Sequence, residues 1–172
     1  MKSTLEDLKT RRAVRTYSDE PVPREALEAV LEAGTYAPTA RGEQRVCIVA
    51  VTNREERDAI SRMNAAVMGS TGDPFYGAPV VLVVFGDGSW PFGKLDGSAV
   101  MTNLLNAAHA VGLASCWINR AEEVFKTEEG RALKAKWGVP EEYVGVGNVI
   151  LGLSDARPEP AARKEGFIIY AD

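Results

Sequence analysis

The sequence is poor in the residues that build metal centres, disulfide frameworks and catalytic triads. Its 172 residues include one histidine, His109, and two cysteines, Cys47 and Cys116. One histidine excludes a zinc site built mainly from histidines and leaves a Ser-His-Asp triad with a single possible base. The cysteines form no CxxC pair, so we expect no disulfide framework, no metal site and a reducing cytoplasm. Chemistry in this chain therefore requires a cofactor.

Nucleotide-binding and membrane-spanning signatures are also missing. Neither GxGxxG nor GxxxxGK[ST] occurs, which disfavours a Rossmann nucleotide fold and a P-loop. No apolar run is long enough to cross a bilayer, and the opening MKSTLEDLKTRR lacks the apolar core of a signal peptide. The net charge of −4 gives no global basic field that would recruit nucleic acid. We expect a soluble protein without nucleic-acid or membrane partners.

What remains is the composition of an ordinary globular domain. Hydrophobic residues make up 45% of the chain and charged residues 26%. The length suffices for one domain with a substantial core, and there is no internal repeat, low-complexity tract or linker. We therefore expect a single domain over residues 1–172.

Helical periodicity and continuous apolar runs alternate along the chain. Helices are expected at about 4–11, 22–33, 54–67, 97–114 and 127–137. Strands are expected at 46–51, 79–85, 115–118 and 144–153, with a strand-like end at 167–170. The helix at 97–114 is apolar nearly all round, which indicates a place in the core or at a subunit interface. Because strands and helices do not alternate strictly, we predict an α+β fold, a central mixed or antiparallel sheet flanked by helices in three layers.

The most unusual local feature is a basic cluster near the N-terminus. Lys9, Arg11, Arg12 and Arg15 place four cations within seven residues of an acidic chain. Arginine presents a rigid fork of donors that matches phosphate oxygens, so the cluster is a candidate phosphate site. A solvated basic face explains the same composition equally well. A second cationic pair, Arg163-Lys164, lies near the other end of the chain.

Five segments, taken in order, resemble motifs of the nitroreductase superfamily. The segment RRAVRTY (11–17) resembles its RRSxRxF/Y opening, and APTARGEQ (37–44) resembles its APSAxNxQPW loop. DPFYGAP (73–79) is similar to the lead into its next strand, and residues 96–118 are similar to its QNLxLAAxxLGLGSCWI helix and strand. The last resemblance is to the C-terminal part of the short members of this superfamily. It is carried by GVP (138–140), Gly152 and RKEG (163–166).

The resemblance implies a flavoenzyme. Members of this superfamily bind FMN, form homodimers through long central helices and build each flavin site from both subunits. The activity implied is transfer of hydride from NAD(P)H through flavin N5 to a nitroaromatic, a quinone or a similar acceptor. Alternatives on the same scaffold are dehalogenation, flavin fragmentation, enoyl-type reduction, or a non-catalytic FMN carrier or redox sensor.

The resemblance also assigns cofactor-binding residues by position. The N-terminal segment would hold the FMN phosphate and the pyrimidine edge, with further phosphate contacts from near the C-terminus. A loop of the partner chain would line the flavin, and the segment after the central helix would pass near N5. In this sequence the residues are Arg11, Arg12, Ala13, Arg15, Pro38, Thr39, Ala40, Gln44, Asn64, Trp117, Ile118, Asn119, Arg163 and Lys164. No side-chain acid or base is required of them.

Three departures from the motifs bear on flavin affinity. Ala13 stands where the family usually has Ser, and the lost hydrogen bond is worth about 1 kcal/mol. Gly42 replaces the usual Asn, which removes a polar group from the loop. Arg45-Val46 replaces Pro-Trp, which changes the stiffness of the loop and removes an aromatic contact.

Overall fold

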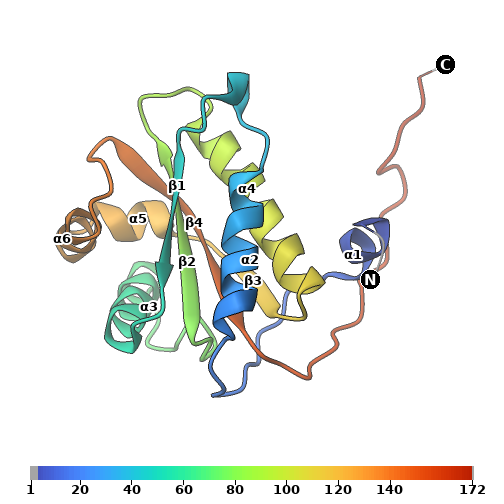
Figure 1. Ribbon diagram of the computed structural model, residues 1–172, viewed down its shortest axis with the longest axis horizontal. Helices are drawn as coiled ribbons and strands as arrows, with labels where there is room; N and C mark the ends of the chain where they lie inside the picture. Colours follow the sequence, from blue (N-terminus) through green and yellow to red (C-terminus); the bar gives the residue numbers. More distant parts are fainter. Residues whose placement is uncertain (1–3, 172) are drawn as a thin grey trace.

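The computed structural model of the chain describes residues 4–171 (Figure 1). Its helices and strands follow one another as α1 (Thr4–Thr10), α2 (Arg24–Thr35), the 3-10 turn η1 (Ala40–Gly42), β1 (Val46–Val51), α3 (Arg54–Met68), β2 (Val80–Asp87), α4 (Gly93–Ala110), β3 (Ala114–Ile118), α5 (Ala121–Lys126), α6 (Glu128–Lys136) and β4 (Tyr143–Gly152). Within this part of the chain, no helix combines the length and apolarity needed to cross a membrane.

The four strands form one sheet in the order β1-β2-β4-β3, and every neighbouring pair is antiparallel. All eight residues of β2 are buried, because this strand lies inside the sheet and both of its faces are covered. Its side chains alternate between two cores: Val81, Val83 and Phe85 face one, whereas Val80, Leu82 and Val84 face the other. The sheet expected to be mixed or antiparallel is thus antiparallel.

Helices cover both faces of the sheet. Figure 1 shows α2 and α4 on one side and α3, α5 and α6 on the other. Residues of α2 and α4 share one core with the sheet, and residues of α3 and α5 share the second. This arrangement confirms the predicted α+β fold in three layers.

The structure corrects the expected elements at three places. Helix α4 begins at Gly93 and ends at Ala110, four residues before each expected limit, and Gly112 at φ 85° turns the chain beyond its end. A short helix, α5, precedes the expected helix at 127–137. The strand-like end at 167–170 forms no strand within the described residues, because no neighbouring strand in this chain pairs with it.

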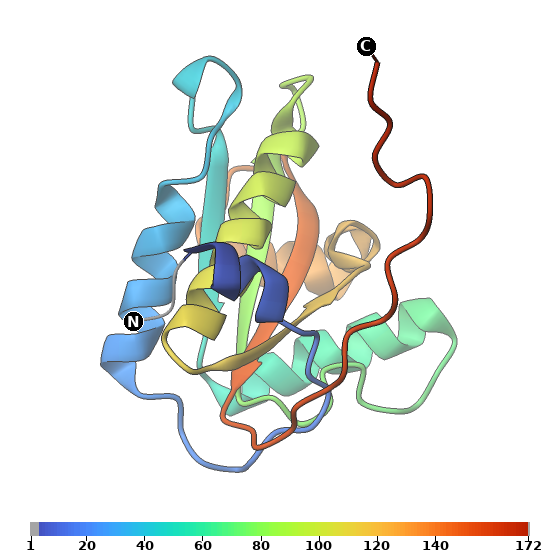
Figure 2. The ribbon, with the colours of Figure 1, turned by 90° about the vertical axis from the view of Figure 1, so that its right-hand side faces the viewer.

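The two ends of the chain flank β3 but differ in how they pack. Residues 11–18 run beside the sheet, where Val14 N–H donates to the carbonyl of Ser115 (3.0 Å) and Ser18 N–H donates to that of Leu153 (2.9 Å). Beyond residue 160 the described residues are exposed, and the two views show this segment leaving the body of the molecule (Figures 1 and 2).

Candidate functional site

The candidate site begins where the N-terminal basic segment pairs with β3. Ala13 forms a parallel bridge with Ser115, so neighbouring side chains of the segment point to opposite sides. Ala13 and Tyr17 pack against the core that faces α3 and α5, and the Tyr17 hydroxyl donates to the carbonyl of Val14 (2.6 Å). The segment is therefore fixed to the sheet by both backbone and side-chain contacts.

Arg11 and Arg15 lie on the Cys116 side of this segment. Burial raises the pKa of the Cys116 thiol, and the positive charges of Arg15 and Arg11 oppose that rise. Within residues 4–171, neither guanidinium forms a hydrogen bond or an ion pair. Arg11 is half-buried and Arg15 is exposed. Two accessible cations without protein partners are suited to binding an anion.

Arg12 is held differently. Its Nη1 donates to the carbonyls of Lys9 and Arg11, both at 2.8 Å, and its Nε is buried without a hydrogen-bond partner in the described chain. Arg11 and Arg12 both line a cavity of about 370 Å³ between α1, the end of α4 and residues 154–160. Arg157 and His109 line the same cavity. Three arginines and one carboxylate, that of Glu159, therefore line this space, and the excess of guanidinium groups suits a phosphate.

The end of β3 supplies the next part of the site. The Trp117 indole Nε1 donates to Asn119 Oδ1 (2.8 Å), and the amide of Asn64 on α3 donates to the Asn119 carbonyl (2.8 Å). Ile118 is buried between them, and Asn119 is exposed. The structure thus brings Asn64 together with 117–119, on the sheet edge along which Ala13 lies.

The loop that carries Pro38, Thr39, Ala40 and Gln44 lies elsewhere. Both views place it at the opposite end of the molecule from residues 12–21 (Figures 1 and 2). Thr39 Oγ1 accepts from the backbone N–H of Gln44 (3.1 Å), and the backbone N–H of Ala40 donates to Asp96 on α4 (2.8 Å). Within one chain, this loop and the N-terminal arginines therefore do not meet.

Arg163 and Lys164 lie on the exposed C-terminal segment. The Arg163 guanidinium donates to the carbonyl of Ala161, two residues away, through Nε (3.2 Å) and Nη2 (2.6 Å). The structure does not bring this pair together with Arg11 and Arg15. Residues 158–160, just before the pair, do line the 370 Å³ cavity beside Arg11 and Arg12.

Two residues that organise the site were absent from the sequence prediction. Asp96 on α4 is buried and accepts hydrogen bonds from Ala40 N–H and from the Trp90 indole (3.3 Å). Asn148 on β4 is fully buried and donates to the carbonyls of Ile118 and Asn119. The available signal for Asn148 was one polar amide inside the apolar run Val146–Leu151.

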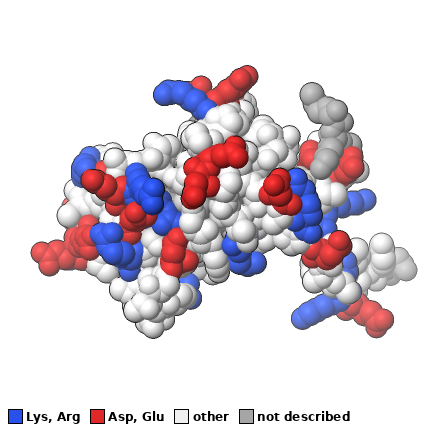
Figure 3. Space-filling view, turned by 90° about the horizontal axis from the view of Figure 1, so that it is seen from below, with Lys and Arg blue, Asp and Glu red and all other residues white. Residues whose placement is uncertain are grey.

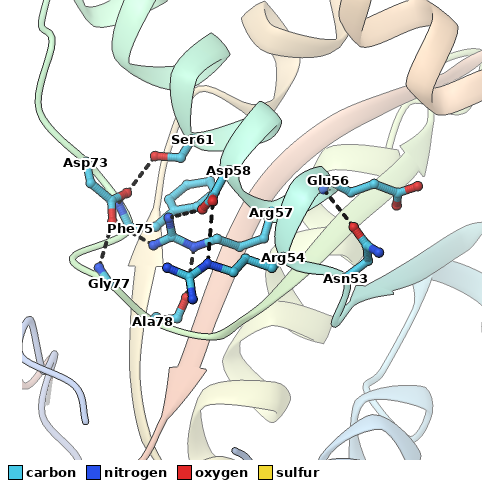
Figure 4. Close-up of polar contacts among 10 residues, drawn as sticks. All are labelled: Asn53, Arg54, Glu56, Arg57, Asp58, Ser61, Asp73, Phe75, Gly77 and Ala78. Atoms are coloured by element: carbon cyan, nitrogen blue, oxygen red, sulfur yellow. Dashed lines mark hydrogen bonds and ion pairs between the residues drawn. The ribbon is translucent and has the colours of Figure 1, made fainter. Parts of the chain in front are cut away.

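An ion pair between the buried Arg57 and the partly exposed Asp73 fixes the loop that precedes β2 (Figure 4). Arg57 on α3 donates to Asp73 (2.6 Å), to Asp58 (3.0 Å) and to the carbonyl of Ala78 (2.9 Å). Asp73 also accepts from Ser61 (2.5 Å) and from two backbone N–H groups of its own loop. Burial alone would raise the pKa of Asp73, but these hydrogen bonds together lower it.

The charges elsewhere on the surface are mixed. On the face seen in Figure 3, Lys and Arg side chains alternate with Asp and Glu and with uncharged residues, and they form no continuous basic band. A continuous band is what the nucleic-acid backbone requires. On this face the charges therefore do not form a nucleic-acid surface.

The fold and the site define a class: a three-layer α+β protein with two arginines beside the edge strand of an antiparallel sheet. The guanidinium groups of these arginines form no ion pair within the described residues. The model of the Nitroreductase family matches residues 8–72 and 64–152, which is most of the chain. The chain belongs to the nitroreductase family.

Individual relatives agree with this assignment. The chain is 32% identical over 158 residues to a protein of Archaeoglobus fulgidus provisionally named NADH dehydrogenase/NAD(P)H nitroreductase, covering 88% of this chain and 86% of that protein. It is 30% identical over 159 residues to a protein of the same provisional name from Methanothermobacter thermautotrophicus, with coverage of 90% and 78%. A crystal structure of a Bacteroides fragilis nitroreductase with bound FMN matches over 100% of both chains, with a TM-score of 0.91 and 29% identity.

Proposed function

We propose that this chain is an FMN-dependent oxidoreductase that passes electrons from NADH or NADPH to a nitroaromatic, a quinone or a similar acceptor. The observation that carries the proposal is the guanidinium groups of Arg11 and Arg15, which lie on the Cys116 side of the N-terminal segment and form no hydrogen bond or ion pair within residues 4–171. The family membership supports it. So do the FMN bound by the Bacteroides fragilis relative and the activity for which the archaeal relatives are named.

The residues present fit FMN. Arg11 and Arg12 line a cavity of about 370 Å³ together with Arg157 and Glu159, and they would hold the phosphate, with Arg163 and Lys164 as additional cations. Ala13 offers no hydroxyl to the phosphate, so the arginines would contribute a larger share of the binding free energy. Arg15 would lie by the pyrimidine edge, and residues 117–119 would line the ring together with Asn64. Pro38, Thr39, Ala40 and Gln44 would come from the second subunit, since within one chain their loop lies at the opposite end of the molecule from the segment 12–21 (Figure 2).

Bound FMN would supply the hydride chemistry itself, and the protein would supply binding, orientation and electrostatics. Arg15 would favour negative charge at the pyrimidine edge and thereby raise the reduction potential. No side-chain acid or base is needed, which agrees with a single histidine. His109 Nε2 hydrogen-bonds Thr10 Oγ1 (2.8 Å), where α4 meets α1. Cys47 and Cys116 are free thiols, which supports a reducing compartment such as the cytoplasm.

The partner that we propose is a second copy of the chain. Four consecutive apolar side chains near the C-terminus, Phe167, Ile168, Ile169 and Tyr170, are 68–87% exposed. Within the described part of the chain, strand β1 pairs only with β2 and its outer edge is free, and a groove of about 410 Å³ lies between β1 and α2. Val46, Ile48 and Leu31 line that groove. An apolar segment and an open sheet edge are both unstable in water alone. Pairing between two copies would cover both.

Replacing Phe167 and Ile169 by Ser is expected to shift the protein from dimer to monomer. The substitutions remove the apolar area that would be buried against the second copy. Light scattering coupled to size exclusion measures the mass, which should fall from about twice 18.6 kDa toward 18.6 kDa. Glu165→Ser, on the same segment, is the control and should leave the dimer intact. Wild-type protein that runs as a monomer at tens of micromolar concentration would refute the dimer.

The catalytic proposal is tested by anaerobic titration of the FMN-loaded protein. NADH or NADPH is expected to bleach the flavin absorbance, and a nitroaromatic or a quinone should restore it within the turnover time. Free FMN at equal concentration is the control. If neither nicotinamide bleaches the bound flavin, the protein is a carrier or a sensor rather than a reductase. If bleaching occurs but neither acceptor reoxidises the flavin, the chemistry is a different one on the same scaffold.

A further inference from the structure

Two buried amides converge on the backbone carbonyl of Asn119, directly after the end of β3. Asn64 Nδ2, on α3, donates to the Asn119 carbonyl at 2.8 Å. Asn148 Nδ2, on β4, donates to the same carbonyl at 3.4 Å and to that of Ile118 at 3.3 Å. Asn148 stands opposite Ile118 in the register of β3 and β4. The end of β3 is thus held from a helix and from the neighbouring strand.

These amides are costly in their surroundings. Both side chains are 0% exposed, and Asn148 is flanked in sequence by glycine and apolar residues. Burying an amide without full hydrogen bonding destabilises a protein, and an apolar residue of similar size would pack here without that cost. In the described residues, both Oδ1 atoms are buried without a partner. Each amide therefore bonds only through its Nδ2 donor, and both donors bond to backbone carbonyls of the same turn.

Fixing the Asn119 carbonyl also fixes the direction of the next N–H. The described chain has no cis peptide bond, and in a planar trans peptide the carbonyl and the N–H point in opposite directions. With the Asn119 carbonyl turned toward the two buried amides, the N–H of Arg120 turns away from them. Arg120 has φ 75°, a left-handed conformation that a non-glycine residue adopts only when its surroundings hold it there.

The side chain of Asn119 is held as well. The Trp117 indole donates to its Oδ1 at 2.8 Å. The turn 119–120 is therefore held at the carbonyl by two amides and at the side chain by an indole. Packing of the core does not require these hydrogen bonds. We therefore infer that they orient the backbone atoms that the turn exposes on its outer side.

We propose that Asn148 and Asn64 are positioning residues, which hold the backbone at the end of β3 in the orientation that a flavin ring requires. The inference rests on the proposed FMN site, in which residues 117–119 line the ring. It gives Asn64 an indirect role, through the Asn119 carbonyl. It also explains why β4 carries an amide at position 148, where an apolar side chain would suffice for packing.

The test uses three variants: Asn148→Ser, Asn64→Ser and the double variant that carries both substitutions. Each is compared with the control variant Asn103→Ser. Asn103 is a matched control, because its amide also donates to a backbone carbonyl, that of Ala33 at 3.2 Å, but does so between α4 and α2. Affinity for FMN and for riboflavin is measured by fluorescence quenching. The reduction potential of the bound flavin is measured as well.

Asn148→Ser and Asn64→Ser are each expected to weaken FMN and riboflavin by about the same factor, roughly tenfold, since a mispositioned backbone affects the ring and not the phosphate. The reduction potential should fall and the visible spectrum should shift. The double variant should lose little more than either single one, because both amides act on the same carbonyl. Affinities, potential and spectrum equal to those of Asn103→Ser would overturn the inference.

Two further outcomes keep the proposals separable. Wild-type protein that binds no FMN ends the proposed function itself, whereas wild-type binding with unaffected variants ends only the positioning role. If the variants do not fold, hydrogen exchange of the wild-type protein decides. The Arg120 amide is expected to exchange at least tenfold more slowly with FMN than without it, and an unchanged rate would overturn the inference.

Discussion

Replacing Arg11 by Ala is expected to weaken FMN binding by about 10- to 100-fold, and Arg15→Ala by a similar factor. Each guanidinium would make a charge-assisted contact, which contributes about 1.5–3 kcal/mol. Neither guanidinium makes a hydrogen bond or an ion pair within residues 4–171, so removing it should leave the stability of the fold nearly unchanged. Fluorescence quenching of FMN measures the affinity, and thermal unfolding of the apoprotein measures the stability.

The control for these variants is Arg62→Ala. Arg62 is exposed on α3, and its replacement changes the net charge of the protein by the same amount. It should leave the FMN affinity within about twofold of wild type, because a distant surface charge is screened by salt. Arg11→Ala should also reduce the preference for FMN over riboflavin, since riboflavin lacks the phosphate. Unchanged affinity in both the Arg11 and Arg15 variants would place the phosphate elsewhere.

Asp73→Asn is expected to lower the free energy of unfolding by about 3 kcal/mol. The side chain of Arg57 is 8% exposed, and without Asp73 it loses its shortest ionic contact (Figure 4). Breaking a buried ion pair from one side leaves a poorly compensated charge and costs about 3–5 kcal/mol. We expect the lower end of this energy range because Asp73 is 35% exposed and Asp58 still contacts Arg57. Urea unfolding with a linear extrapolation measures the difference.

The effect of Asp73→Asn should depend on pH in a defined direction. The folded state lowers the pKa of Asp73 from its ordinary value of 3.8, so the carboxylate stabilises the protein above that pH. The difference between wild type and variant should be constant at neutral pH and should shrink as the pH falls below about 4. Asp58→Asn is the control, because Asp58 is 44% exposed and should cost less than about 1 kcal/mol. A cost equal to that of Asp73→Asn would contradict the role given to the buried pair.

Elements set by a strong local pattern were predicted well. The continuous apolar runs at 46–51 and 79–85 correspond to β1 and to most of β2, and the helix expected at 54–67 corresponds to α3. Burial on both faces explains the apolar run in β2, whereas β1 is equally apolar although it lies at the sheet edge, half-buried and with Ala50 exposed. The boundaries of α4 were displaced because its first turn depends on a close approach: a Cβ on Gly93 would lie 2.2 Å from the carbonyl oxygen of Asp87.

Short elements and long-range contacts were harder to predict. Helix α5 has six residues and starts after Arg120 in a left-handed conformation, which arginine does not signal in sequence. The apolar segment 167–170 has strand-like composition but no strand to pair with inside one chain, so its local propensity alone did not decide its structure.

The candidate site was predictable only in part. Motif order gave the arginines, and the structure places Arg11 and Arg15 on the same side of the N-terminal segment. The amide of Asn148 and the carboxylate of Asp96 act through contacts with residues 29 and 56 positions away, to Asn119 and Ala40 respectively. Contacts at such separations follow from the topology of the sheet and not from local spacing.

The most direct test of the account is the absorbance spectrum of the protein after incubation with FMN and removal of free flavin. We expect a yellow protein that retains about one flavin per chain, with a visible band shifted from that of FMN in water. Colourless protein, obtained after the same treatment with the fold intact by circular dichroism, would contradict the claim that Arg11, Arg15 and the end of β3 form a flavin site.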